Sequence, residues 1–400
     1  MKKITHLVFL LSFLSACTMP ASQAQAPDGS VPSQATATQI STDLQAEFAT
    51  EGAALPLEIN APLIDGPSII SIEMIDTVNG WGITNTQIVR TNDSGVTWYN
   101  VTPPGIAETG YSVVTQFLDA THAWLQFPDP NNYPNGGMMY RTSDGGITWS
   151  SNATPFSSGE ISFIDSNNGW MMADLGVGAG SMAVSVFQTA DGGVTWNRTF
   201  TNDPNIEGAG DSLPLGGLKY GLTATNMQTA WIYGVTYSTG SAYLFRTDDA
   251  GKSWILVPME LSAEAQGAEL SVEKVQFESA MQGTIVMRIT GPKIRMVIYQ
   301  TNDGGATWIP ASATVPGGGL VDVVSAQEII FYGTDQFHVT KDASSTWNII
   351  SPDVVFGESM ISMDFATSSV GWVITSDPAT SHSTLYKTED GGTTWFPVIP

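Results

Sequence analysis

The stretch Arg141-Thr142-Ser143-Asp144-Gly145-Gly146-Ile147-Thr148-Trp149 decides the fold, because its pattern Thr-x-Asp-x-Gly-x-Thr/Ser-Trp recurs along the chain. Successive copies are separated by 51, 47, 58, 54, 39 and 48 residues. Recurrence at this period predicts a repeat architecture. The repeat motif is centred on Asp93, Asp144, Asp191, Asp249, Asp303, Asp342 and Asp390, and each copy ends on Trp98, Trp149, Trp196, Trp254, Trp308, Trp347 or Trp395.

Each repeat motif predicts two strands joined by a tight turn. The glycine two residues after the aspartate supplies a positive φ at little steric cost. The aspartate side chain is expected to accept hydrogen bonds from the backbone N–H groups that follow it. The tryptophan is expected to pack beneath the turn, where it can bury about 200 Å². At Asp342 the glycine is replaced by Ser344, so we expect a looser turn or another turn type there.

A second pattern precedes most copies: an apolar strand, a polar turn and a Gly-Trp or Ala-Trp pair. Each unit then contains four strands, a to d, with the pair opening strand b and the repeat motif joining c to d. The expected fold is therefore all-β, a seven-bladed β-propeller of four-stranded antiparallel blades. The second pattern ends at Trp81, Trp124, Trp170, Trp231 and Trp372, and the expected blades cover about 66–104, 110–155, 160–203, 217–260, 270–312, 318–352 and 359–400.

The repeat motif resembles the Asp-box, also called the sialidase-type or BNR repeat, from about residue 66 to the end of the chain. This resemblance implies that the box braces the structure. The blade pattern, an export signal and the chain length together resemble the photosystem II assembly/stability factor family. That resemblance implies a chaperone-like binding platform. Its photosynthetic members are implied to use basic residues on the ring, whereas this chain is acidic and has six arginines.

The N-terminal residues 1–16 are typical of a secretory signal, with Lys2 and Lys3 before an apolar run that is too short to span a membrane. The run ends before Cys17, the only cysteine, in a sequence that resembles the bacterial lipoprotein box and implies lipid attachment at Cys17. The alternative is an ordinary signal peptide with an incidental cysteine. Residues 17–55 are expected to be a disordered tether, residues 56–400 the propeller, and residues 56–65 could add an edge strand.

The composition of the chain limits the classes of partner that it can bind. Charged residues make up 13% of the chain, and the net charge is −24, or 12 − 38 = −26 once Lys2 and Lys3 are removed with the signal. This charge argues against binding to nucleic acid or to anionic lipid. We expect a monomer in the cell envelope, periplasmic or at the cell surface, that binds a protein or glycan and meets the membrane only through its lipid anchor.

Strand order predicts where a ligand would bind. The a–b turns and the repeat motifs lie on one face of the ring, whereas the b–c loops and the d–a links lie on the other. Binding residues concentrate on variable loops carried by a rigid scaffold, so we expect the second face to be the ligand face. The candidate residues there are Asp129, Asn131, Tyr133, Asp174, Asp211, Asp377 and His382.

No cofactor is expected, although Asp174, Asp203, Glu207 and Asp211 have the oxygen ligands that Ca²⁺ prefers. A solvated loop is the competing interpretation for each acidic loop. Arg288, Lys293 and Arg295 bracket a b–c hairpin and predict either a local anion-binding spot or an ordinary strand surface.

The sequence gives limited support for an enzymatic function. A sialidase needs an arginine triad. Four of the six arginines lie directly beside a repeat motif, namely Arg90, Arg141, Arg198 and Arg246, which leaves only Arg288 and Arg295, both from one blade. The four histidines are scattered, and one cysteine allows no Cys/His metal site.

The main prediction is a non-catalytic envelope lipoprotein that acts as a binding platform, with no catalytic residue assigned. The alternative is a secreted glycoside hydrolase of the Asp-box propeller type, which would need two suitably spaced carboxylates.

Overall fold

The computed structural model describes residues 58–399 except residues 111–112 and 381. The expected signal (1–16), Cys17 and the tether (17–55) lie outside the described residues. The described part is built from β-strands and one short 3-10 helix, η2 (Gly357–Ser359). None of its helices has the length and apolar run needed to cross a bilayer.

The first three sheets are antiparallel and follow the chain. The first has five strands: β1 (Leu63–Ile64), β2 (Ser71–Met74), β3 (Gly80–Ile83), β4 (Ile88–Thr91) and β5 (Trp98–Asn100). The second contains β6 (Val114–Phe117), β7 (Ala123–Pro128), β8 (Gly137–Thr142) and β9 (Ser150–Thr154). The third contains β10 (Gly159–Phe163), β11 (Gly169–Gly178), β12 (Ser181–Thr189) and β13 (Asn197–Thr201).

The next sheet has nine strands, because two antiparallel sets are joined by the single residue pair Val235 and Ser271. One set is β14 (Leu218–Ala224), β15 (Ala230–Val235), β16 (Tyr243–Thr247) and β17 (Ile255–Leu256). The other is β18 (Glu269–Phe277), β19 (Gly283–Thr290), β20 (Ile294–Thr301), β21 (Ile309–Pro310) and β22 (Val315–Pro316).

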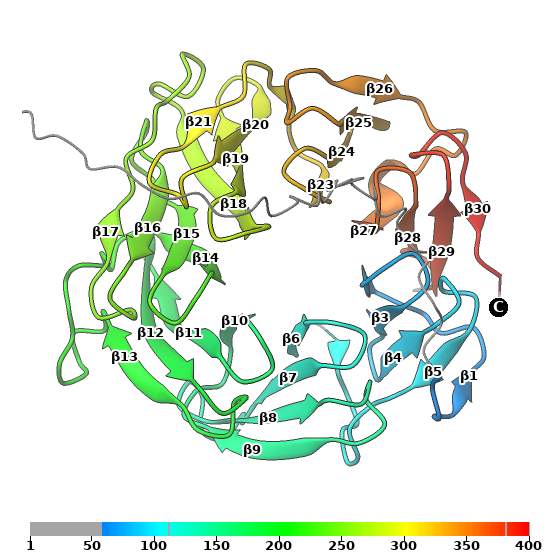
Figure 1. The fold of residues 1–400 in the computed structure, drawn as a ribbon, viewed down its shortest axis with the longest axis horizontal. Coiled ribbons are helices and arrows are strands. Elements are labelled where there is room, and N and C mark those ends of the chain that lie inside the picture. Colours follow the sequence, from blue (N-terminus) through cyan, green and yellow to red (C-terminus); the bar gives the residue numbers. More distant parts are fainter. Residues whose placement is uncertain (1–57, 111–112, 381, 400) are drawn as a thin grey trace, which may run out of the picture. The chain divides into compact units, whose positions relative to one another are not determined.

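Two four-stranded sheets complete the described chain. They are β23 (Leu320–Val323), β24 (Ile329–Gly333), β25 (Gln336–Thr340) and β26 (Asn348–Ile350), then β27 (Met360–Phe365), β28 (Gly371–Asp377), β29 (His382–Thr388) and β30 (Phe396–Pro397). In Figure 1 strands such as β6, β10, β18, β23 and β27 lie nearest the middle, and strands such as β9, β13, β26 and β30 lie at the rim. Within the segment 56–65, where an added edge strand was expected, β1 lies at Leu63–Ile64 and pairs with β5 at the edge of the first sheet.

The repeat motif forms the same hydrogen-bonded turn in copy after copy. The Asp144 carboxylate accepts from the backbone N–H of Thr148 at 2.9 Å and from the hydroxyls of Thr148 and Thr142 at 2.6 and 2.7 Å. Gly146 has φ +85°. The expectation of a different turn at Asp342 was wrong, because Ser344 adopts φ +66° and the Asp342 carboxylate accepts the equivalent bonds from Thr346.

The second pattern joins neighbouring sheets. Nε1–H of Trp81 donates to the Asp119 carbonyl at 3.0 Å, and Nε1–H of Trp124 donates to the Gly192 carbonyl at 2.9 Å, each in the following sheet. Trp231 departs from this pattern, since its buried Nε1 has no partner and its ring stacks on Phe277 at 4.3 Å. These rings are almost fully buried, so each brings a large apolar surface to the contact between sheets.

A ring of polar side chains joins the innermost strands. Each of these residues pairs, in its own sheet, with the Trp of the second pattern or the residue at the equivalent position. Most of the side chains also hydrogen-bond to the backbone of the innermost strand of the neighbouring sheet. Phe163 N–H donates to Gln116 Oε1 at 2.6 Å, and Phe365 N–H donates to Asp322 Oδ2 at 2.7 Å. We call these residues the collar: Glu73, Gln116, Ser162, Thr223, Gln276, Asp322 and Asp364.

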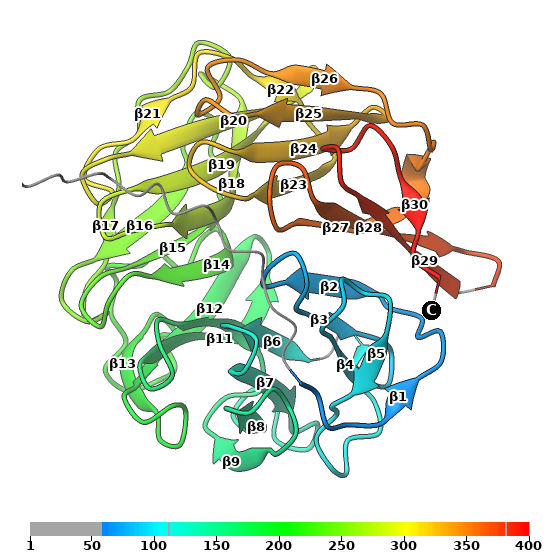
Figure 2. The same cartoon turned by 45° about the vertical axis from the view of Figure 1, so that its right-hand side comes forward.

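The first and last sheets pack directly on each other, as Figures 1 and 2 show for the blue and red strands. Met74 N–H donates to Asp364 Oδ2 at 2.6 Å, and Trp372 Nε1–H donates to the Ser94 carbonyl at 2.9 Å. The apolar cluster at this seam includes Trp98 and Leu385. Side-chain packing and these hydrogen bonds therefore close the circle between strands far apart in sequence.

Candidate functional site

The b–c loops and d–a links form one surface, which we call the loop face. Backbone bonds join them directly, since Gly240 N–H donates to the Ala268 carbonyl at 2.7 Å and Gly217 N–H donates to the Gly180 carbonyl at 2.9 Å. Lys219 fixes the long link before β14: its buried Nζ donates to the carbonyls of Met182, Pro214, Leu215 and Gly217. Burial lowers the pKa of Lys219 to about 8.

Two β-bulges at matching positions bring side chains together on the loop-face half of the nine-stranded sheet. Tyr220 is the unpaired residue of a bulge in β14, and Glu273 is the unpaired residue of a bulge in β18. A bulge bends its strand and redirects a side chain. Glu273 Oε1 lies 3.2 Å from Arg288 Nε, and the side chains of Tyr220 and Tyr237 are 45% and 60% exposed.

Four neighbouring residues, Glu269 among them, interact electrostatically with Tyr220. Burial raises the pKa of the Tyr220 hydroxyl, and Tyr237, Glu273 and Glu269 raise it further, whereas Arg288 lowers it. We call Tyr220, Tyr237, Glu269, Glu273 and Arg288 the junction cluster. It combines two exposed aromatic rings with carboxylates and a guanidinium, groups that suit recognition of a polar partner. Of these residues, only Arg288 was singled out from the sequence.

Two pockets open on the loop face. One, of about 600 Å³, lies in the link before β14 and is lined by Asn202, Asp211 and Leu213 among others. The other, of about 470 Å³, lies between β24 and β27 and is lined by Tyr332, Asp335 and Glu358 among others. Volumes of this order are typical of small-ligand sites.

The residues predicted for the ligand face lie on several sheets and do not form one site. Asp129 and Asn131 are in the β7–β8 loop, where Asn131 N–H donates to Asp129 Oδ1 at 2.9 Å, and Tyr133 is 55% exposed beside them. Asp174 lies in β11 and accepts from Gly176 N–H at 2.8 Å. Several of these carboxylates therefore stabilise their own turns.

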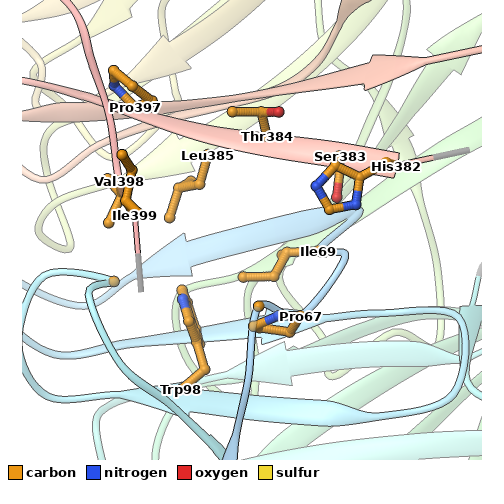
Figure 3. A pocket seen from close by; sticks show the side chains of 12 residues that line it. Pro67, Ile69, Trp98, His382, Ser383, Thr384, Leu385, Pro397, Val398 and Ile399 are labelled. Atoms are coloured by element: carbon orange, nitrogen blue, oxygen red, sulfur yellow. The ribbon is translucent and has the colours of Figure 1, made fainter. Parts of the chain in front are cut away.

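Asp377 and His382 face each other on β28 and β29. The N–H of Ala379 and the hydroxyl of Thr380 hold the pKa of Asp377 below its usual value. His382 also lines a slot of about 220 Å³ at the seam between the first and last sheets, where Figure 3 shows Ile69 and Trp98 on one side and Leu385 on the other.

The acidic loop expected to suit Ca²⁺ does not gather its ligands. Asp203 Oδ1 accepts from the N–H and side-chain amide of Asn205, both at 2.9 Å. Among residues 58–399, leaving aside the undescribed positions 111–112 and 381, no group of three His, Cys, Asp or Glu side chains is placed to hold a metal ion.

Acids on the innermost strands were not singled out from the sequence. Burial raises the pKa of Asp364 to about 8, with Asp322 and Glu73 adding to the rise, while Met74 N–H and Lys274 oppose it. The surrounding strands desolvate Glu73 although solvent reaches its side chain, and its pKa is about 7. Lys274 Nζ lies 3.9 Å from Asp322 Oδ1. Strand alternation gives no signal that these residues from different sheets meet.

The sequence of the chain matches no protein family and no curated protein. In structure it is similar to a GH74 xyloglucanase from Xanthomonas campestris, with 12% identity, 85% of this chain and 55% of that chain covered, and a TM-score of 0.56. This similarity supports a β-propeller fold, and the chain spans little more than half of that enzyme.

Two further structures align with TM-scores below 0.5, and nothing about the fold or function is inferred from them. YCF48 bound to D1 peptide aligns at 16% identity over 86% of this chain and 87% of that chain, with a TM-score of 0.42. A PL25 ulvan lyase bound to its saccharide aligns at 11% identity over 84% of this chain and 97% of that chain, with a TM-score of 0.45.

Proposed function

We propose that this chain is a seven-bladed Asp-box propeller, exported as a lipoprotein through Cys17, that acts as a non-catalytic platform in the cell envelope. It binds a protein or glycan partner through the loop face, in the manner of an assembly factor. The repeat motifs brace the opposite face, because each of their carboxylates is engaged in its own turn. The variable residues of the loop face are free to differ from blade to blade.

The junction cluster is the observation that carries this proposal. Its two tyrosines are large, exposed rings, and such residues dominate binding surfaces when a partner covers them. The bulges in β14 and β18 redirect Tyr220 and Glu273, and the Glu273–Arg288 ion pair orders the polar part of the surface. Bulges that redirect side chains are over-represented beside functional sites.

A pull-down from envelope extract tests the platform. The bait is the full chain, compared with the double variant Tyr220→Ala/Tyr237→Ala and with variants in which the 127–137 or 173–182 loop is shortened. We expect the double variant to lose at least one specific partner. Phe396→Ala, which removes an exposed ring from β30, outside the loop face, is the matched control. Unchanged partners in all variants would count against the platform.

A glycoside hydrolase is the second candidate, favoured by the acids on the innermost strands. Asp364 and Glu73 have raised pKa values, as a general acid needs, and Asp322 lies within electrostatic range of both. An assay for release of reducing ends from xyloglucan tests this candidate. Activity that falls at least about a hundredfold in Asp364→Asn would support hydrolysis. No release above a blank would leave the platform as the better proposal.

A further inference from the structure

The pocket between β24 and β27 has an apolar floor and an acidic rim. Leu320, Tyr332 and Met360 supply the apolar part, and the last two are almost fully buried. Asp335 and Glu358 are exposed at the same pocket. The remaining lining residues are Thr334 and glycines, which add backbone but no charge.

The Asp335 carboxylate is held in place. The Tyr332 hydroxyl donates to Asp335 Oδ1 at 3.1 Å. Thr334 and Asp335 form the b–c turn with φ values of +54° and +59°, a left-handed conformation that costs energy in residues other than glycine. The turn therefore keeps a carboxylate at the pocket at some cost to stability. Glu358 makes no ion pair within the described residues.

Among the residues that the structure describes, no Lys, Arg or His lines this pocket. Two cations flank the lining segments along the chain: Arg295 pairs with Pro316, two residues before the first lining residue, and Lys341 directly follows β25. Neither contributes to the pocket wall. The other loop-face pocket repeats the arrangement, with Asp211 beside Leu213 and Leu215 and no Lys, Arg or His. The lining of both pockets therefore contains carboxylates without a Lys, Arg or His, although the buried Lys219 ammonium bonds to the Pro214 and Leu215 carbonyls behind the wall of the second pocket.

We propose that the β24–β27 pocket receives a lysine or arginine side chain from a basic segment of a partner protein. Lysine and arginine have aliphatic stems that pack on apolar surface and charged heads that stay at the rim, and this pocket has the same two parts. The stem would lie against Leu320 and Met360, and the head would meet Asp335 and Glu358. The inference rests on the proposed binding function of the loop face and chooses protein over glycan as the partner.

The test measures binding of a fluorescently labelled octalysine peptide to the full chain by anisotropy. We expect the double variant Asp335→Asn/Glu358→Gln to weaken binding roughly threefold to tenfold, because two exposed ion pairs are lost. The matched control Asp129→Asn/Asp377→Asn removes the same charge from the same face and should have a smaller effect. Raising the salt from about 50 to 200 mM should reduce the difference between variants.

A second readout locates the peptide. In a protein labelled at methionine methyl groups, the Met360 resonance should shift on peptide addition, whereas that of Met138, on β8, should not. The proposal would be overturned if both double variants lost the same amount of affinity for octalysine, or if the Met360 resonance did not shift. Either result would show only a general electrostatic attraction of the peptide to an acidic protein. Binding of neutral xyloglucan oligosaccharide that depends on Asp335 and Glu358 would overturn it too. In either case a partner lost from the Tyr220→Ala/Tyr237→Ala pull-down would leave the proposed function standing.

Discussion

At the scale of single residues, the repeat motif owes its uniformity to hydrogen bonds that close within a few positions. Burial on its own would raise the pKa of Asp144, but hydrogen bonds from Thr148 and Thr142 outweigh it and leave the pKa below its ordinary value. The residue after the aspartate has a positive φ even where it is not glycine, as at Ser94, Ala250 and Ala343. The turn therefore tolerates a side chain there in three copies.

Gly145 occupies this position in the second sheet, where a different constraint applies. A Cβ on Gly145 would lie 1.7 Å from Nη1 of Arg90, whose guanidinium is buried over the Trp81 ring. We expect Gly145→Ala to lower the free energy of unfolding by roughly 1–3 kcal/mol more than Gly208→Ala does. Gly208 has a similar φ of +80° and open space around it, so it controls for backbone strain. Urea denaturation measures both, and equal losses would contradict the role given to Arg90.

Asp364 predicts a pH dependence of stability. Its pKa is raised to about 8 in the folded protein, so between about pH 4 and 8 the folded state binds more protons than the unfolded state. Stability from this group is fully present below the unfolded pKa and is lost as pH rises toward 8. Glu73, Asp322 and Lys274 face the same group, and the raised pKa of Glu73 acts in the same direction.

The check is urea denaturation of the native chain and Asp364→Asn between pH 5 and 9. Asparagine can still accept the Met74 N–H bond but cannot titrate. We expect the decline in stability with rising pH to be shallower in Asp364→Asn, while Asp129→Asn keeps the native slope. Parallel slopes in all three proteins would contradict the assignment.

At the scale of secondary-structure elements, the links between sheets vary in length far more than the sheets vary in their number of strands. The link before β14 is fixed by Lys219, whose ammonium meets backbone carbonyls and also lies 5.2 Å from the centre of the Tyr243 ring. The Tyr243 hydroxyl donates to the Pro214 carbonyl at 3.2 Å. A single buried cation thus replaces regular secondary structure as the support of this loop.

We expect Lys219→Met to loosen this link, because the carbonyls it satisfied would lose their donor, at a cost of about 1–3 kcal/mol. Amide exchange in residues 202–217 should accelerate more than exchange in β15 or β16. Lys252→Met removes an exposed lysine and should leave the exchange unchanged. Uniform acceleration across the protein would instead indicate a global loss of stability.

At the scale of the whole molecule, closure depends on the seam between the first and last sheets. Trp372 is fully buried there and donates to the Ser94 carbonyl. We expect Trp372→Ala to cost about 3–5 kcal/mol, since it removes a large buried ring and a hydrogen bond between sheets. Tyr133→Ala should cost little, because that ring is exposed. Thermal unfolding of both variants checks this, and a small effect at Trp372 would mean that the seam is not needed for stability.

The proposed attachment to the membrane is also a property of the whole molecule, because it determines where the protein resides in the cell. We expect Cys17→Ser to move the protein from the membrane fraction to the soluble fraction, because the lipid anchor is the only membrane contact that we propose. Cell fractionation with immunoblotting measures the distribution. Retention of Cys17→Ser on membranes would exclude Cys17 as the attachment site, whatever the loop face binds.

The amino-acid sequence by itself determined the repeated turns, the all-β character and the four-strand units. Their hydrogen bonds join residues within about one turn, so a short contiguous motif such as Thr142 to Trp149 contains the information. It also indicated that variable segments share one face, which follows from strand order alone. Ser344 misled the prediction because serine can adopt the positive φ that glycine usually supplies.

Only the tertiary structure decided which side chains meet. Met74 and Asp364 are 290 positions apart, and the junction cluster and the β24–β27 pocket draw residues from separate strands. Desolvation, which raises the pKa of Asp364, depends on neighbours that chain closure brings together and that no local pattern specifies. Bulges such as the one at Tyr220 shift a strand by one residue and so break the alternation from which a side chain's direction would be read.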